Sequence, residues 1–190
     1  MSSTESRSGR RSVRLVAALV AVVLAAGCGT SAAGQERVDW DLRHGHTAAQ
    51  VHWHGGSSFE LDDGVRVRLR LPDGKVFDER VDRFGADRDG TQVRDVLLYY
   101  PASSVSAAHS RADRLGRRWD IDMRNIDAWY ERERTHPHHG DDIPTASTGG
   151  QDGRPIGAHG PIPTVETVYS FDDAKPVVVK LEFFWKPTAP

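Results

Sequence analysis

The sequence predicts an α+β domain, a mostly antiparallel sheet of about five or six strands with two helices packed on one face. Several short stretches alternate apolar and polar residues, which is typical of half-buried strands. Two stretches between residues 105 and 134 repeat apolar residues every three or four positions, which is typical of helices. Turns rich in glycine, proline and aspartate separate these stretches, so strands and helices occupy separate parts of the chain.

Residues 1–27 have the composition of a secretory signal peptide. Leu15 to Ala26 is a run of twelve apolar residues, and four arginines precede it: Arg7, Arg10, Arg11 and Arg14. A helix that crosses a bilayer needs about 20 apolar residues, so this run is too short for an ordinary transmembrane helix. The sequence therefore predicts that residues 1–27 are removed. Two alternatives to this processing remain open. The segment could be an uncleaved signal anchor, or the protein could be secreted after cleavage near residues 31–33.

The end of this segment resembles the lipobox of bacterial lipoprotein precursors. Ala26, Gly27 and Cys28 match that pattern, and Leu24 stands one position earlier than the leucine usual in the family. The resemblance implies that Cys28 is lipidated, becomes the new N-terminus and anchors the protein on the extracytoplasmic face of the cell membrane. Cys28 is also the only cysteine in the chain, and a lone free thiol in an exported protein invites unwanted pairing.

The rest of the chain is predicted to be a tether followed by one domain. Residues 28–37 form the lipidated tether, and residues 38–190 form a single α+β domain with a long loop rich in glycine, proline and histidine at 135–163. Removal of residues 1–27 leaves 21 of the 25 basic and 26 of the 27 acidic residues, a net charge of −5. This charge argues against nucleic acid as a partner.

The clearest strand signal is at residues 65–71, where four apolar residues alternate with three arginines. Residues 72–75 supply a turn, and residues 76–84 are predicted to return as the partner strand. The arginines could bind a polyanion, but we favour pairing across the strands with Asp78, Glu79 and Asp82.

The aspartates between residues 82 and 95 are predicted to mark a polar turn between two strands. Aspartates cluster there around Gly90, but a calcium loop centred on this glycine would begin at Gly85 and end at Val96, neither of which supplies a side-chain carboxylate. Residues 93–100 then form a strand within the sheet, which Pro101 ends.

Two helices follow. Ser103 or Ser104 caps the first, whose apolar stripe runs from Val105 to Trp119 and which Gly116 closes if it is left-handed. The second runs from about residue 122 or 125 to residue 134. The last hairpin pairs residues 165–171 with 176–185, and one face of its final strand is predicted to pack under the helices.

The histidines are the residues most suggestive of chemistry, because eight of the nine lie in residues 44–54 and 136–159. In an extended strand His52 and His54 would share one face and bury Val51 and Trp53 on the other. Neutral imidazoles bind copper, zinc or nickel, and the carboxylate of Asp141 or Asp142 could complete the coordination shell of the metal. The candidate ligands are His44, His46, His52, His54, His136, His138 and His139.

Three functions therefore remain open for an exported, membrane-anchored protein. One is capture of a transition metal through these histidines. Another is a non-catalytic module of the cell envelope that binds cell-wall polymer or a partner protein through exposed aromatic residues. A third is a pH-responsive element, since clustered histidines gain charge near pH 6.5. The chain lacks the common hydrolase, nucleotide-binding and zinc-protease motifs, which favours binding over catalysis.

Overall fold

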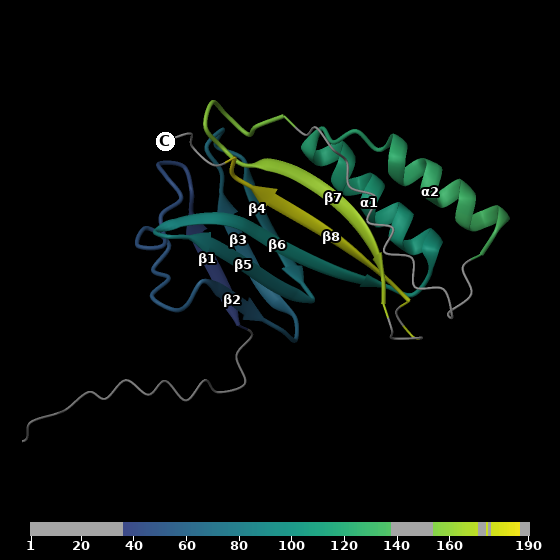
Figure 1. Ribbon diagram of the computed structural model, residues 1–190, viewed down its shortest axis with the longest axis horizontal. Coiled ribbons are helices and arrows are strands. Elements are labelled where there is room, and N and C mark those ends of the chain that lie inside the picture. Colours follow the sequence, from purple (N-terminus) through teal and green to yellow (C-terminus); the bar gives the residue numbers. More distant parts are fainter. Residues whose placement is uncertain (1–35, 138–153, 171–173, 175, 187–190) are drawn as a thin grey trace, which may run out of the picture. The chain divides into compact units, whose positions relative to one another are not determined.

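The computed structural model describes residues 36–137, 154–170, 174 and 176–186, all within the unit Gly34–Pro190. Strands dominate this part of the chain, and the two helices lie between the sixth and seventh strands (Figure 1). The elements in order are β1 (Arg37–Asp41), β2 (Ser58–Leu61), β3 (Val65–Arg70), β4 (Val76–Val81), β5 (Arg83–Asp89), β6 (Gln92–Ala102), α1 (Val105–Trp119), α2 (Arg124–Thr135), β7 (Ile162–Tyr169) and β8 (Val177–Phe184).

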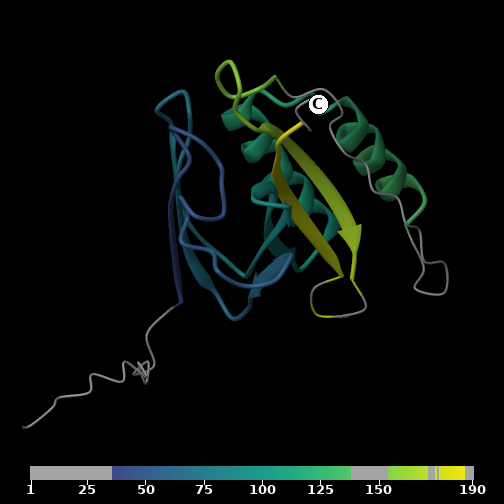
Figure 2. The same ribbon diagram turned by 60° about the vertical axis from the view of Figure 1, so that its left-hand side comes forward.

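The single sheet predicted from the sequence is wrong, because the strands form two sheets. One has three strands in the order β1-β3-β4, and the other has five in the order β2-β5-β6-β8-β7. Figure 2 shows the purple and blue strands of the first sheet apart from the green and yellow strands β7 and β8. The sequence also missed β1, which lies parallel to β3, and β2. Both strands do alternate polar and apolar residues, Arg-Val-Asp-Trp-Asp in β1 and Ser-Phe-Glu-Leu in β2, so the strand signal was present in these short stretches and was overlooked.

The predicted strand at residues 76–84 is in fact two strands in different sheets. It begins as β4, which pairs with β3, and after Asp82 the chain continues as β5, which pairs with β6. The polar turn predicted between these strands is also wrong, because Arg83–Asp89 form β5, with a register shift between Asp87 and Arg88. Pro101 does not end β6 but pairs with Val178 inside it.

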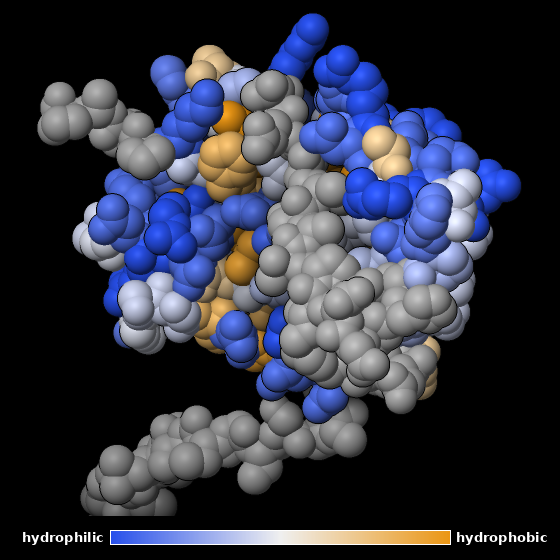
Figure 3. Space-filling view, turned by 45° about the vertical axis from the view of Figure 1, so that its right-hand side comes forward, coloured by the Kyte–Doolittle hydropathy of each residue, from blue (hydrophilic) through white to orange (hydrophobic). Residues whose placement is uncertain are grey.

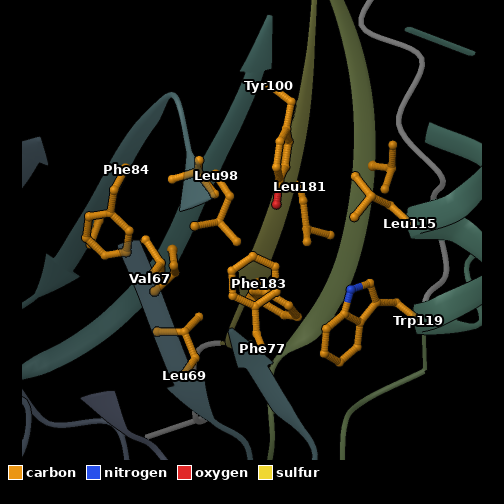
Figure 4. Packing of buried hydrophobic residues seen from close by; sticks show 14 of the residues in the cluster. Val67, Leu69, Phe77, Phe84, Leu98, Tyr100, Leu115, Trp119, Leu181 and Phe183 are labelled. Atoms are coloured by element: carbon orange, nitrogen blue, oxygen red, sulfur yellow. The ribbon is translucent and has the colours of Figure 1, made fainter. Parts of the chain in front are cut away.

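The core lies where both sheets and α1 meet (Figure 4). The predicted alternation of β3 is confirmed, since Val65, Val67 and Leu69 are fully buried. Phe77 of the small sheet packs edge-on against Phe183 of the large sheet, with 6.3 Å between ring centroids. Trp119 of α1 meets the same Phe183 at 5.0 Å. Each such side chain stabilises the fold by about 1.5–3 kcal/mol on burial.

Both helices are where the sequence predicts them, but their ends differ. Ser104 is the N-cap of α1, and its side chain accepts a hydrogen bond from the Ala107 amide at 3.1 Å. The helix does not close at Gly116. It continues to Trp119, and Asp120 takes the left-handed conformation instead, with φ of 54°. Gly116 is buried, because the Met123 side chain occupies the space that a Cβ would need.

The arginines of β3 pair partly as predicted. Arg66 meets Asp78 at 2.7 Å, whereas Arg70 meets Asp39 of the unpredicted strand β1, also at 2.7 Å. Glu79 lies on the other face of β4 and pairs with Arg118 of α1, so its predicted pairing with the β3 arginines is wrong.

The C-terminal hairpin is confirmed as β7 and β8, and β7 begins at Ile162, before the predicted start. Val179, Leu181 and Phe183 are fully buried on the face that contacts α1. In the part of the chain that the structure describes, neither helix has an apolar stretch of membrane-spanning length. The surface in Figure 3 is mostly hydrophilic, with a few hydrophobic patches between hydrophilic areas.

Candidate functional site

A groove of about 560 Å³ lies along strand β1, which is an edge strand of the three-stranded sheet. Four consecutive residues of β1 line it, so the edge of the strand itself borders the groove and not only one of its faces. The other wall comes from the loop between β1 and β2 and from β2. The lining residues are Arg37, Val38, Asp39, Trp40, Val51, His52, Trp53, His54, Gly55 and Phe59.

The wall that carries the histidines is a turn and not a strand, which corrects the sequence-based prediction. The amides of Val51, His52 and Trp53 donate to carbonyls three to five residues earlier in the chain, as in a helical turn. His52 has a φ of 57°, in the left-handed region. Burial still alternates, with Val51 and Trp53 buried and His52 and His54 exposed. The predicted burial pattern is therefore right although the predicted geometry is wrong.

Arg88 of β5 fixes the end of this wall. Its guanidinium donates to the carbonyl of Gly56 at 2.9 Å and to that of Gly55 at 2.6 Å. The Arg88 amide donates to Ser57, and the guanidinium carbon lies 5.3 Å from the centre of the Trp53 ring. One side chain thus ties the loop to the large sheet through both hydrogen bonds and a cation–π contact.

The floor of the groove is aromatic. Trp40 and Trp53 stack with 6.3 Å between centroids, and Phe59 lies 6.2 Å from Trp53. The Trp53 indole N–H is buried and has no acceptor among the described residues, and a Cβ at position 55, where Gly55 has none, would lie 3.4 Å from this nitrogen. A buried donor without a partner is costly, so an acceptor that entered beside Gly55 would be favoured.

The rim carries a positive balance. Asp39 is the one carboxylate among the described lining residues, and it already meets Arg37 at 3.2 Å and Arg70 at 2.7 Å. Two guanidinium groups therefore face one carboxylate. This rim favours a ligand with acidic groups.

The backbone along this edge has hydrogen-bonding groups that β3 does not use. Glu36 accepts from the Arg66 amide and the Leu42 amide donates to Arg70, so the even-numbered residues of β1 point toward β3. Because direction alternates along a strand, Arg37 and Asp39 point their N–H and C=O groups toward the groove. No described residue pairs with them.

The structure separates the two N-terminal histidine pairs. His46 lies away from the groove and stacks on Trp185, with 5.0 Å between centroids. It lines a pocket of about 310 Å³ together with His159, and a second of about 150 Å³ that includes Arg94. Burial lowers the pKa of His46 below its ordinary value, because desolvation disfavours the charged form of the imidazole.

The remaining predicted ligands do not join either site. His44 is exposed in the loop after β1, and His136 is exposed at the end of α2. Cys28, His138 and His139 lie outside the described residues. Among the residues that are described, no three histidine, cysteine, aspartate or glutamate side chains are grouped as a metal site would require.

Sequence reasoning missed most of the groove. Strand β1 contributes four of its lining residues, and its alternation of polar and apolar residues was overlooked in the sequence. Arg88 was hidden in a stretch that resembled a polar turn. The alternation of Val51, His52, Trp53 and His54 located one wall of the groove.

Comparisons with models of known protein families, with curated proteins and with solved structures found no match.

Proposed function

We propose that this chain is an exported, lipid-anchored binding protein that holds its ligand in the β1 groove on the extracytoplasmic face of the membrane. The observation that supports binding is the groove itself, which combines an aromatic floor, a positively charged rim and a strand edge that no described residue pairs with. Concave sites with an apolar floor and a few convergent polar groups are the usual form of a binding site.

The proposed anchor places the groove near the membrane. If Cys28 carries the lipid, only residues 29–36 separate it from β1. Eight residues span at most roughly 29 Å when fully extended. The groove would therefore stay within reach of components of the cell envelope, and we propose such a component as the ligand.

Retention on isolated cell envelopes tests this proposal. Every described element lies in the unit Gly34–Pro190, so a chain of residues 29–190 keeps the whole fold. We expect this chain to be retained on washed envelopes with or without a chelator. The double variant Arg37→Glu/His54→Glu, which reverses the charge of the rim, should lose at least about tenfold in retention.

The matched control is Arg132→Glu/His136→Glu, which makes the same two changes at exposed positions of α2 and its end. It should be retained like the parent chain. The proposal is wrong if the parent chain washes through, or if both double variants bind as the parent does.

One observation supports metal capture as a second candidate, namely that His52 and His54 line the same groove. Two imidazoles could hold copper(II) or zinc together with water or ligand groups. Calorimetry with each ion at about pH 7.5 tests this. Saturable binding that His52→Ala/His54→Ala removes would support it, and no saturable heat with either ion would rule it out.

A further inference from the structure

We propose that the groove takes an extended peptide segment of an envelope protein, which adds to the small sheet as a fourth strand beside β1. This inference rests on the proposed function and names the class of its ligand. Added strands bind through main-chain hydrogen bonds, and pockets for alternate side chains supply the specificity.

The first argument is the strand edge. Arg37 and Asp39 direct backbone N–H and C=O groups into the groove, and no described residue uses them. Strands at sheet edges that keep such groups free are templates for pairing with another chain. At about 3.3 Å per residue, the five residues of β1 would pair with a segment of similar length.

The second argument is the position of the aromatic floor. The inner side chains of β1 are Val38 and Trp40, both buried, and Trp53 and Phe59 continue the apolar surface beyond the edge. Every second side chain of an added strand would point toward this surface. The structure therefore selects a segment whose apolar residues occur at alternate positions.

The third argument is charge. The other side chains of the added strand would lie beside Arg37 and Asp39 on the outer face. Since Asp39 is already matched by Arg37 and Arg70, the available charge there is positive. Acidic residues at the intervening positions complement it, so the expected ligand alternates apolar and acidic residues.

The probe is a five-residue peptide of alternating valine and glutamate, acetylated and amidated, titrated into residues 29–190. Hydrogen exchange measured by NMR reports the pairing directly. In the free chain the amides of Arg37 and Asp39 should exchange faster than those of Val38 and Trp40, which point toward β3. Saturating peptide should slow exchange at Arg37 and Asp39 by at least about tenfold.

Two N-methylated peptides provide the sharpest control. One carries N-methyl groups on its valines and the other on its glutamates. Only alternate amides of an added strand face β1, so one peptide should bind at least about tenfold more weakly and the other should bind nearly as the parent. A peptide with lysine in place of glutamate should also bind more weakly.

Equal binding of both N-methylated peptides, or unchanged exchange at Arg37 and Asp39, would overturn strand addition. A concentration-dependent dimer that protects the same amides without peptide would overturn it too, because the occupant would then be a second copy of the chain. Retention on envelopes without any peptide binding would overturn this inference and leave the proposed function in place.

Discussion

At the scale of single residues, much of this fold depends on side chains that satisfy backbone groups. Ser104 caps α1, and Gln50 accepts from the Thr47 amide at 2.9 Å in the loop that forms one wall of the groove. His46 shows a different effect, since it is half-buried against Trp185 and its pKa is lowered by that burial. Hydrogen bonds and desolvation at such positions can be tested one residue at a time.

Replacement of Ser104 by alanine should lower the free energy of unfolding by about 1 kcal/mol, because the Ala107 amide loses its acceptor at the start of α1. Urea unfolding followed by circular dichroism measures this change. Ser103→Ala is the matched control, since Ser103 is exposed and is not the cap. Equal losses in both variants would contradict the capping role.

The lowered pKa of His46 predicts a pH dependence of stability. The folded state keeps His46 neutral at pH values where the unfolded chain, with a pKa of about 6.5, already binds a proton. This contribution to stability is present above about pH 6.5 and is lost as the pH falls through the lower folded pKa. The advantage of the parent over His46→Gln should therefore shrink with falling pH. Urea unfolding at several pH values measures it, and a constant difference would contradict the prediction.

At the scale of elements, α1 is tied to the small sheet as well as packed on the large one. Arg118 pairs with Glu79 of β4 and donates to the Val76 carbonyl at 3.2 Å. Its guanidinium carbon also lies 5.1 Å from the centre of the Trp119 ring. Most other ion pairs are exposed and join neighbouring residues or strands, whereas this one joins a helix to a sheet far apart in the sequence.

Arg118→Met should therefore lower the free energy of unfolding by about 1 kcal/mol, as Glu79 loses its partner and Val76 loses a donor. Arg117→Met is the matched control, because Arg117 is exposed and pairs only within α1, with Asp113. We expect the control to change stability by less than about 0.5 kcal/mol in a urea titration. Equal free energies of unfolding for the two variants would show that the link between β4 and α1 does not stabilise the fold.

At the scale of the whole molecule, the folded unit and the proposed anchor are separable. Every described strand and helix lies after residue 36, whereas the proposed lipid site is Cys28. One part of the chain would thus determine location, and the other would determine what is bound.

In a host that processes lipoproteins, Cys28→Ala should move the protein out of the membrane fraction without changing its melting temperature, because no described contact involves residue 28. Immunoblots of fractionated cells and mass spectrometry of the product measure both. The parent chain should lack residues 1–27 and carry acyl chains on Cys28. A parent chain that keeps residues 1–27 would contradict the proposed processing.

How far the fold could be predicted depended on the range of the interactions. The alternation at β3, the stripe on α1 and the Ser104 cap depend on neighbours within a few residues, so they could be recognised in the sequence. Two other features depend on pairing between distant segments. One is the parallel pairing of β1 with β3, and the other is the passage of the chain at Asp82 from the three-stranded sheet to the five-stranded sheet. An alternating pattern gives no information about which sheet a strand joins.

By itself the sequence determined the two helices of the described residues and the hairpins β3–β4 and β7–β8, because local periodicity encodes them. The signal segment stays a prediction. Only the tertiary structure decided that the strands divide between two sheets, that His46 and His52 lie at different sites, and that the edge of β1 faces an aromatic groove. These features arise from contacts between segments such as β1, Arg88 and Phe59 that are far apart in the chain. Long-range packing selects such contacts, and no single stretch of sequence carries them.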